Sequence, residues 1–161
     1  MSTPQAKPRM IWHAGFIVEN LEESMAELST GLGVSWASVH DIRGQRLDGP
    51  NGQSWTLDSR VCFSTDLPLS IELIEPSPGT PNVRRGTSAF HHLGYWAEDL
   101  AAEEERLAGL GYGCVMFRDD PQTALRRVLV TDGPFGILIE ATSALVARPG
   151  LDQFYPEGGV R

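Results

Sequence analysis

The chain has 161 residues, which is enough for one domain with a substantial core but too few for a second full domain. Hydrophobic residues make up 41% and charged residues 21%, an ordinary globular composition that argues against wholesale disorder. A formal charge of −8 would repel nucleic acid phosphates and anionic membranes, so both are poor partners. An anionic substrate would need a local basic patch, and only Arg84–Arg85 and Arg126–Arg127 offer one.

The cysteines and the apolar runs bear on where the protein works. No apolar run approaches the ~20 residues of a membrane span, and residues 1–10 lack the apolar centre of a signal peptide. Cys62 and Cys114 are isolated, with neither CxxC spacing nor the density of a disulfide framework. Reduced thiols are typical of the cytoplasm, so we expect a cytoplasmic protein.

The first half of the chain begins with an apolar and aromatic run, Ile11–Val18, that predicts a strand. Asn20 stands where an N-cap belongs and two glutamates follow it, so a helix is expected to start there. A glycine predicts the end of this helix. Its buried face is marked by apolar residues at helical spacing: Leu21, Met25, Leu28 and Leu32. Strand-like stretches and one turn-rich segment come next: strands at Val34–Ile42, Arg60–Asp66 and Leu69–Pro76, and the turns at Leu47–Trp55.

The second half repeats this order after a Pro- and Gly-rich linker. Phe90–Ala97 predicts a strand, and Asp99 predicts the N-cap of a second helix. The buried face of that helix is marked by Leu100, Leu107 and Leu110. Three more strands are predicted, at Cys114–Asp119, Ala124–Asp132 and Gly136–Ala144. The tail is again Pro- and Gly-rich, so we expect a surface loop or a disordered end there.

The two halves are copies of one pattern. Aligning His13 with His92, an offset of 92 − 13 = 79, also brings Gly15 onto Gly94. Each half is therefore interpreted as a βαβββ module, and the fold class as α+β with two tandem modules in a single domain. The predicted divisions are an extension at 1–9, a first module at 10–75, a linker at 76–88, a second module at 89–146 and a tail at 147–161.

Four side chains occupy matching places in the two modules. His13 and His92 lie on the first strand of each module, and Glu72 and Glu140 lie on the last. Two imidazoles and two carboxylates in such positions suit a divalent metal held between the halves, with Zn, Ni, Co, Mn and Fe all compatible. A site of this kind can polarise a carbonyl while one carboxylate moves a proton.

The register of two strands leaves choices, because adjacent residues point to opposite faces of a sheet. The repeat favours His92 over His91, since only His92 is followed by the x-Gly-aromatic pattern of His13. His91 is then expected on the outer face, near the helix layer or at a dimer contact. Glu72 and Glu75 differ by three positions, so only one can face the cavity, and the pattern does not decide between them.

Several segments resemble the vicinal oxygen chelate superfamily, which includes glyoxalase I and methylmalonyl-CoA epimerase. The resemblance extends from about Ile11 to Ala144 and is strongest in HAGFIVENLEESM, IELIEPSPG, FHHLGYWAEDLAA and GILIEATSA. It implies paired βαβββ modules whose curled mixed sheet encloses a metal cleft, usually within a homodimer. It also implies four metal ligands, which by motif are His13, Glu72, His92 and Glu140. All four positions hold competent ligands, unlike those of the metal-free bleomycin resistance proteins.

The same resemblance implies a metal-dependent isomerase or lyase that acts on a small-molecule carbonyl or thioester substrate. Glu140 is the carboxylate best placed to move a proton, with Glu72 as its counterpart. The epimerases also use a glutamate after the first helix, where this chain has only His40, Asp41 and Asp48. That departure weighs against epimerase activity itself but not against metal-assisted proton transfer. The alternatives are a ring-cleaving dioxygenase of the extradiol type and a non-catalytic binding or resistance protein.

Overall fold

The computed structural model describes residues 9–66, 68–146 and 151–156. The predicted extension at 1–9 and tail at 147–161 therefore fall largely outside the described residues. The first half contains β1 (Ile11–Ile17), α1 (Leu21–Leu32), β2 (His40–Asp48), β3 (Ser54–Phe63) and β4 (Ser70–Ile74). The second half contains β5 (Phe90–Ala97), α2 (Leu100–Gly109), β6 (Cys114–Asp119), β7 (Arg126–Asp132) and β8 (Leu138–Ser143). The predicted α+β fold of two βαβββ units is confirmed.

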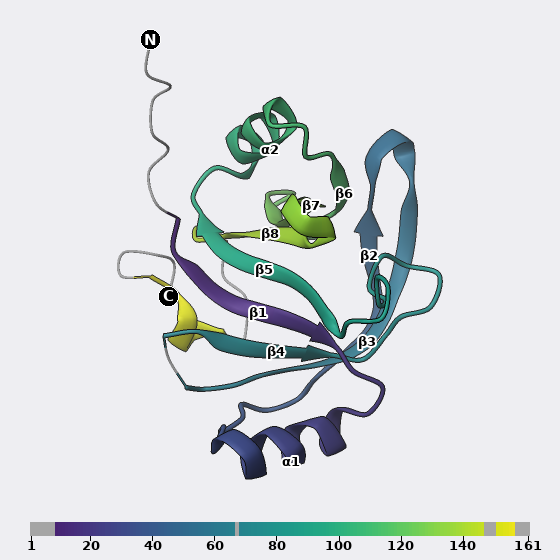
Figure 1. Ribbon diagram of the computed structural model, residues 1–161. Helices are drawn as coiled ribbons and strands as arrows, with labels where there is room; N and C mark the ends of the chain where they lie inside the picture. Colours follow the sequence, from purple (N-terminus) through teal and green to yellow (C-terminus); the bar gives the residue numbers. More distant parts are fainter. Residues whose placement is uncertain (1–8, 67, 147–150, 157–161) are drawn as a thin grey trace.

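The strands form one closed barrel in the order β1-β4-β3-β2-β6-β7-β8-β5. Each half supplies four neighbouring strands, and the halves meet where β1 runs antiparallel to β5 and where β2 meets β6 (Figure 1). Within each half the first and last strands are parallel, β1 with β4 and β5 with β8. The two first strands and the two last strands therefore lie side by side in the order β4-β1-β5-β8.

The two helices lie on the outside of the barrel, at opposite sides of the molecule (Figure 1). Each begins as predicted: the side chain of Asn20 accepts a hydrogen bond from the backbone N–H of Glu23, and that of Asp99 accepts one from Ala102. Gly33 ends α1 in the left-handed conformation, with φ 71°. Each helix packs on its own half, because Leu21 of α1 joins the cluster over β3 and β4, and Leu100 of α2 joins the one over β7 and β8.

Apolar and aromatic side chains fill part of the barrel interior. Trp12 and Trp96 stack with ring centroids 4.7 Å apart, and Phe63 lies 5.5 Å from Trp12. A short 3-10 helix, Asp152–Phe154, places Phe154 against the same aromatic cluster. The described part of the predicted tail is thus packed on the core rather than loose on the surface.

The β2–β3 hairpin differs from the prediction. The turn-rich segment Leu47–Trp55 contains only a tight turn at Pro50–Gly52, and strands run to Asp48 before it and from Ser54 after it. Meanwhile Val34–Val39 holds no strand apart from a single bridge at Trp36. Turn-forming residues therefore marked one bend correctly, but their density hid the ends of the two strands that the bend joins.

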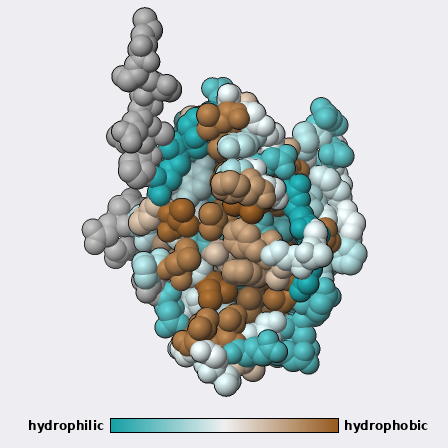
Figure 2. Space-filling model, viewed as in Figure 1, coloured by the Kyte–Doolittle hydropathy of each residue, from teal (hydrophilic) through white to brown (hydrophobic). Residues whose placement is uncertain are grey.

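An apolar area lies on the outer face where β1 and β5 run between the two helices (Figures 1 and 2). Beside it, Met10 is 54% exposed and Ile11 is 48% exposed. Among the described residues, no helix is long and apolar enough to cross a membrane.

Candidate metal centre

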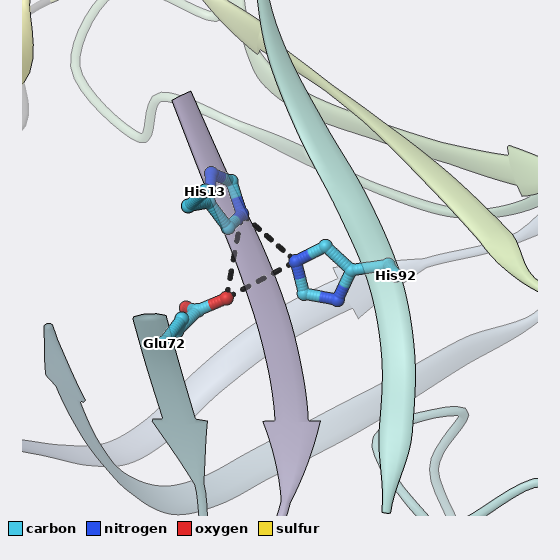
Figure 3. A group of neighbouring side chains, drawn as sticks. All are labelled: His13, Glu72 and His92. Carbon is cyan, nitrogen blue, oxygen red and sulfur yellow. Dashed lines mark hydrogen bonds and ion pairs between the residues drawn. The ribbon is translucent and has the colours of Figure 1, made fainter. Parts of the chain in front are cut away.

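The four predicted residues converge on the inner face of the barrel, each from a different strand. His13 comes from β1, Glu72 from β4, His92 from β5 and Glu140 from β8. Figure 3 shows the first three pointing toward one another across the adjacent strands. All four are buried, and all four come from one chain.

The distances between these groups are short. The Nε2 atoms of His13 and His92 lie 2.8 Å apart. A carboxylate oxygen of Glu72 lies 3.1 Å from His92 Nε2 and 3.4 Å from His13 Nε2. The oxygens of Glu140 lie 3.6 Å from His92 Nε2 and 3.7 Å from His13 Nε2. The two imidazoles therefore present their Nε2 atoms to the same small volume as both carboxylates.

Two glycines make this convergence possible. Gly94 faces His13 across the β1–β5 pair, and Gly15 faces His92. A Cβ atom at Gly94 would lie 1.7 Å from Cε1 of His13, and one at Gly15 would lie 2.2 Å from Cε1 of His92. Each His-x-Gly motif thus supplies one imidazole and the space for the imidazole of the other motif. This reciprocity explains why the repeat contains a glycine two residues after each histidine.

The two carboxylates are also placed symmetrically around the two glycines. Gly15 is flanked by Glu72 on β4 and by His92 on β5, while Gly94 is flanked by Glu140 on β8 and by His13 on β1. Two rows of residues therefore cross the four central strands, each with a carboxylate, a glycine and an imidazole. The pseudo-symmetry of the sequence becomes a pseudo-symmetry of donor groups around one point.

His91 orients the imidazole of His92 from behind. His91 Nε2 lies 3.2 Å from the carbonyl oxygen of Pro81, which can only accept, so this nitrogen is the donor. Burial first, and the neighbouring His92 second, lower the pKa of His91 to about 4, so the ring is neutral near pH 7. Its Nδ1 then accepts from His92 Nδ1, 2.9 Å away, which leaves a lone pair on His92 Nε2 at the centre of the cluster.

The predicted position of His91 was wrong. Its side chain is buried beneath the linker at Pro81 rather than lying near the helix layer, and its ring touches that of His92. The sequence held a signal in the HH pair itself, because metal-ligating histidines commonly have a hydrogen-bond partner behind them. The expectation of strict alternation along the strand concealed that signal.

The choice between Glu72 and Glu75 is resolved by their surroundings. Glu75 lies on the outside of the barrel, where it pairs with Arg60 at 3.2 Å and accepts from the backbone N–H of Leu21 at 3.3 Å. Glu72 is the one that reaches the histidines.

The three polar residues predicted after the first helix differ in whether they reach the cavity. His40 lines the cavity beside the four-residue cluster. Asp41 instead pairs with Arg43 on the surface, and Asp48 pairs with Arg46. His40 is therefore the one of the three that can reach a molecule in the cavity.

That cavity has a volume of about 180 Å³ and lies inside the barrel beside the cluster. This is below the roughly 300–1,000 Å³ of pockets for drug-sized ligands, so it suits a small compound or the reacting end of a larger one. Glu72, His92 and Glu140 lie on its wall together with apolar residues from β2, β3, β6 and β7: Leu47, Leu57, Val61, Met116 and Val128.

The donor set fits a divalent metal ion. Imidazole nitrogens and carboxylate oxygens are the ligands that Zn, Ni, Co, Mn and Fe accept in mixed sites. Two buried carboxylates also need a compensating positive charge, which a divalent cation would supply. His13, Glu72 and His92 form the tightest group, with one donor atom of each within 4.8 Å of the others.

A sequence profile of the Glyoxalase/Bleomycin resistance protein/Dioxygenase superfamily matches residues 12–129, well over half of the chain. The chain belongs to this superfamily. The match confirms the resemblance to the vicinal oxygen chelate proteins. No curated protein sequence matches the chain.

Solved structures of the superfamily's fold superpose well at low sequence identity. A hypothetical protein from Bacillus halodurans C-125 has a TM-score of 0.64 and 14% identity over 88% of this chain and 99% of that one. Methylmalonyl-CoA epimerase from Mycobacterium tuberculosis has a TM-score of 0.57 and 17% identity over 87% and 93%. A mutant 4-hydroxymandelate synthase from Streptomyces coelicolor has 0.60 and 18%, over 86% of this chain but 39% of that one. At these identities the superpositions show the fold alone.

Proposed function

We propose that the protein is a metal-dependent isomerase or lyase that moves a proton at the carbon next to a carbonyl. The observation that carries this proposal is the convergence of two imidazoles and two carboxylates on the wall of a mostly apolar cavity. In this proposal His13, Glu72, His92 and Glu140 hold the cation. A bound divalent cation supplies a Lewis acid that stabilises negative charge on a carbonyl oxygen.

The side chains of the chain supply the remaining functions. Glu140 takes the proton, because it lies on the cavity wall and is farther from the two imidazoles than Glu72. Thr142 donates a hydrogen bond to Glu140 Oε1 at 3.2 Å and so orients the carboxylate. His40 is the second group in the cavity that can give or take a proton, in the region where the epimerases use a glutamate. The apolar walls keep water away from the reacting carbon.

The metal part of the proposal is tested by metal content per chain, measured by plasma mass spectrometry on protein purified without chelators. Wild type should carry close to one equivalent of a divalent metal, and His92→Ala should lose it. Glu75→Gln is the matched control, because Glu75 lies outside the barrel, and it should keep the metal. A wild type that neither holds nor takes up Zn, Ni, Co, Mn or Fe would overturn the proposal.

The proton-transfer part is tested by deuterium uptake from D2O into acyl-CoA thioesters and 2-oxoaldehyde hemithioacetals. The metal-loaded wild type should exchange a proton on at least one of them, and Glu140→Gln should lower the rate by about 10²–10⁴-fold. His40→Gln should slow exchange while leaving the metal bound. Absence of exchange across the panel in metal-loaded protein would rule out this chemistry.

We include a homodimer in the proposal. The apolar outer face over β1 and β5 supports it, because exposed apolar areas of this kind commonly mark protein contacts (Figure 2). The four donor groups come from one chain, so the dimer is not needed to assemble them. Sedimentation should therefore show a dimer, and Ile11→Lys should yield a monomer that still binds metal.

A ring-cleaving dioxygenase is the second candidate. Two histidines and one carboxylate form the tightest part of the cluster, which is the donor set that iron oxygenases use. Glu140 weighs against it, since a second carboxylate close to both imidazoles fills space that oxygen chemistry keeps open. Oxygen consumption with catechols by the ferrous protein would favour this candidate over proton transfer.

A further inference from the structure

The cavity carries positive charge as well as the donor cluster. Arg118 of β6 and Arg127 of β7 both line it, in a chain whose formal charge is −8. Most arginines of such a chain are expected on the surface, paired with its abundant carboxylates. Two guanidinium groups on the wall of one small cavity therefore need a structural cause and a chemical use.

A β-bulge turns Arg127 inward. Arg118 faces Val128 across the β6–β7 pair, but the next residue, Asp119, faces Arg126, so Arg127 is the extra residue of the bulge. Arg127 and Val128 both line the cavity as a result. Arg126 points away from it and pairs with Glu104 of α2 at 2.6 Å. The adjacent arginines thus serve opposite faces of one strand.

Side chains from the same half or from β2 hold both cavity arginines in place. Arg118 donates to the amide oxygen of Gln45 at 3.0 Å, a bond that orients the guanidinium. Arg127 forms an ion pair with Asp120, whose carboxylate also accepts from the backbone N–H groups of Gln122 and Thr123. The Nε atom of Arg127 is buried without a hydrogen-bond partner within the described part of the chain.

We propose that Arg118 and Arg127 bind a carboxylate group that the substrate carries at a distance from its reacting carbonyl. The inference rests on the proposed function, because it takes the donor cluster as the place where the carbonyl is bound. Guanidinium groups recognise planar carboxylates through paired N–H donors, and these bonds are strongest where water is scarce. The apolar residues of the cavity wall would hold the carbon chain that joins the two groups.

The substrate class is therefore a small carbonyl or thioester compound that bears a second, ionised acid. A neutral compound of the same length could not form charge-assisted hydrogen bonds to the two guanidinium groups, so we expect it to bind more weakly. The two arginines act as specificity determinants rather than as catalytic residues.

The test compares ligands that share a chelating end and differ only at the far end. Binding of 2-oxoglutarate is measured against 2-oxopentanoate, and 2-oxoadipate against 2-oxohexanoate, by calorimetry on metal-loaded protein. Wild type should bind at least one acid-ended compound about tenfold tighter than its methyl-ended match, as expected for hydrogen bonds to charged groups. Arg118→Gln and Arg127→Gln should each lose most of this preference at unchanged metal content.

Arg126→Gln is the matched control, because Arg126 faces α2, and it should keep the full preference. Arg118→Lys and Arg127→Lys retain the charge without the paired donors and should keep part of it. If a glutamine variant fails to fold, the wild type and the lysine variants still decide the question. Equal affinity of the matched compounds for metal-loaded wild type would overturn the carboxylate site and leave the proposed function intact.

Failure of the proposed function gives a different result. Wild type that takes up no metal would then be titrated with hexanoate and with hexanamide, which differ at one end in charge. Tighter binding of hexanoate, lost in Arg127→Gln and kept in Arg126→Gln, would support the arginine site without the metal. Equal binding of the two would overturn the arginine site as well.

Discussion

The first half of the chain contributes His13 and Glu72 to the donor cluster, and the second half contributes His92 and Glu140, each pair from a first and a last strand. Behind the donors the halves differ. The position that matches His91 under the 79-residue offset is Trp12, since 91 − 79 = 12. His91 supports its neighbour through a hydrogen bond, whereas the Trp12 ring packs 4.0 Å from that of His13.

This difference extends to the cavity. The four central strands, β4, β1, β5 and β8, repeat the same donors and glycines, while β2 and β6 share little beyond their place in the fold. β6 and β7 bring Arg118 and Arg127 to the cavity, whereas β2 brings His40 and Gln45. The duplicated strands thus carry the four proposed metal ligands, and the diverged strands carry the side chains that we propose to select the ligand.

The largest effect on metal binding is expected from filling the space that a glycine of one half leaves for a histidine of the other half. Gly94→Ala places a Cβ against the ring of His13, so the imidazole must leave the cluster. We expect loss of metal and a fall of about 1–3 kcal/mol in the free energy of unfolding. Metal analysis and urea unfolding measure both.

Gly31→Ala is the control for this variant, because Gly31 lies in α1 with open space around it. It should keep the metal and gain about 0.5–1 kcal/mol, since alanine favours the helix. Gly15→Ala should behave like Gly94→Ala. If only one of the two glycine variants lost the metal, the reciprocity between the halves would be refuted.

The second largest effect distinguishes hydrogen bonding behind His92 from aromatic packing beside His13. His91→Ala removes the hydrogen bond to His92 while leaving all four donors, so metal affinity should fall about 10–100-fold. Trp12→Phe keeps an aromatic ring beside His13 and should change the affinity much less. Competition with a chelator of known affinity measures each. Equal losses in both variants would show that packing, not hydrogen bonding, holds the imidazoles.

The third effect concerns how each helix is attached. In the second half, Glu103 of α2 accepts from Tyr95 of β5 at 2.6 Å and from Arg9 and Arg106. Burial alone would raise the pKa of Glu103, but the hydrogen bonds from Arg9, Arg106 and Tyr95 outweigh it and lower the pKa from 4.5 to about 2. The first half attaches α1 to the sheet through Glu22 and Arg60 on the surface instead.

Because the folded-state pKa of Glu103 is depressed, its contribution to stability is fully present above about pH 5 and is lost as the pH falls through 2. Glu103→Gln should therefore lower the free energy of unfolding by about 1–2 kcal/mol near pH 7, less than the full shift implies because water reaches the edge of the cluster. The deficit should shrink as the pH falls below 4.5. Urea unfolding at several pH values measures it, and a deficit independent of pH would contradict this account.

The smallest effect comes from a pair of similar turns. Asp48–Gly52 and Asp132–Gly136 share the pattern DGPxG, and the fourth residue of each is left-handed, Asn51 with φ 58° and Phe135 with φ 60°. Asparagine tolerates this conformation better than phenylalanine does. Phe135 is 97% exposed, so its ring contributes little packing in return.

Phe135→Asn should therefore raise the free energy of unfolding by about 0.5–1 kcal/mol, and Asn51→Phe should lower it by a similar amount. Thermal unfolding of both variants beside wild type measures the difference. A destabilised Phe135→Asn would mean that the exposed ring has a contact partner, for which the proposed dimer is the first place to look.

The fold was predictable because the repeat and the element signals agreed. Asn20 and Asp99 marked the helix starts, and His13 and His92 fixed the alignment that made two βαβββ units visible. The convergence of four side chains followed from the repeat and the resemblance. Their role as metal ligands stays a prediction.

Features that depend on irregular pairing were not predictable. Strict alternation placed His91 outside, and it gives no sign that Arg127 turns inward, because a bulge shifts the facing of one residue without leaving a pattern in the sequence. The full extent of β2 and β3 was hidden because the turn residues at Gly49–Gly52 masked the strand ends on either side of them. The packing of Phe154 on the aromatic cluster depends on distant partners that local composition does not reveal.

The barrel has one thin seam. Asp48 and Phe117 are the single facing pair that joins β2 to β6 among the described residues, while the other neighbouring strands share at least three pairs. Few backbone hydrogen bonds cross such a seam, so we expect it to separate at lower cost than the rest of the wall. The hydrogen bond from Arg118 to Gln45 crosses the same seam. A ligand that took the place of Gln45 as the partner of Arg118 would therefore weaken the junction between the two halves, and the junction would regain this hydrogen bond when the ligand left.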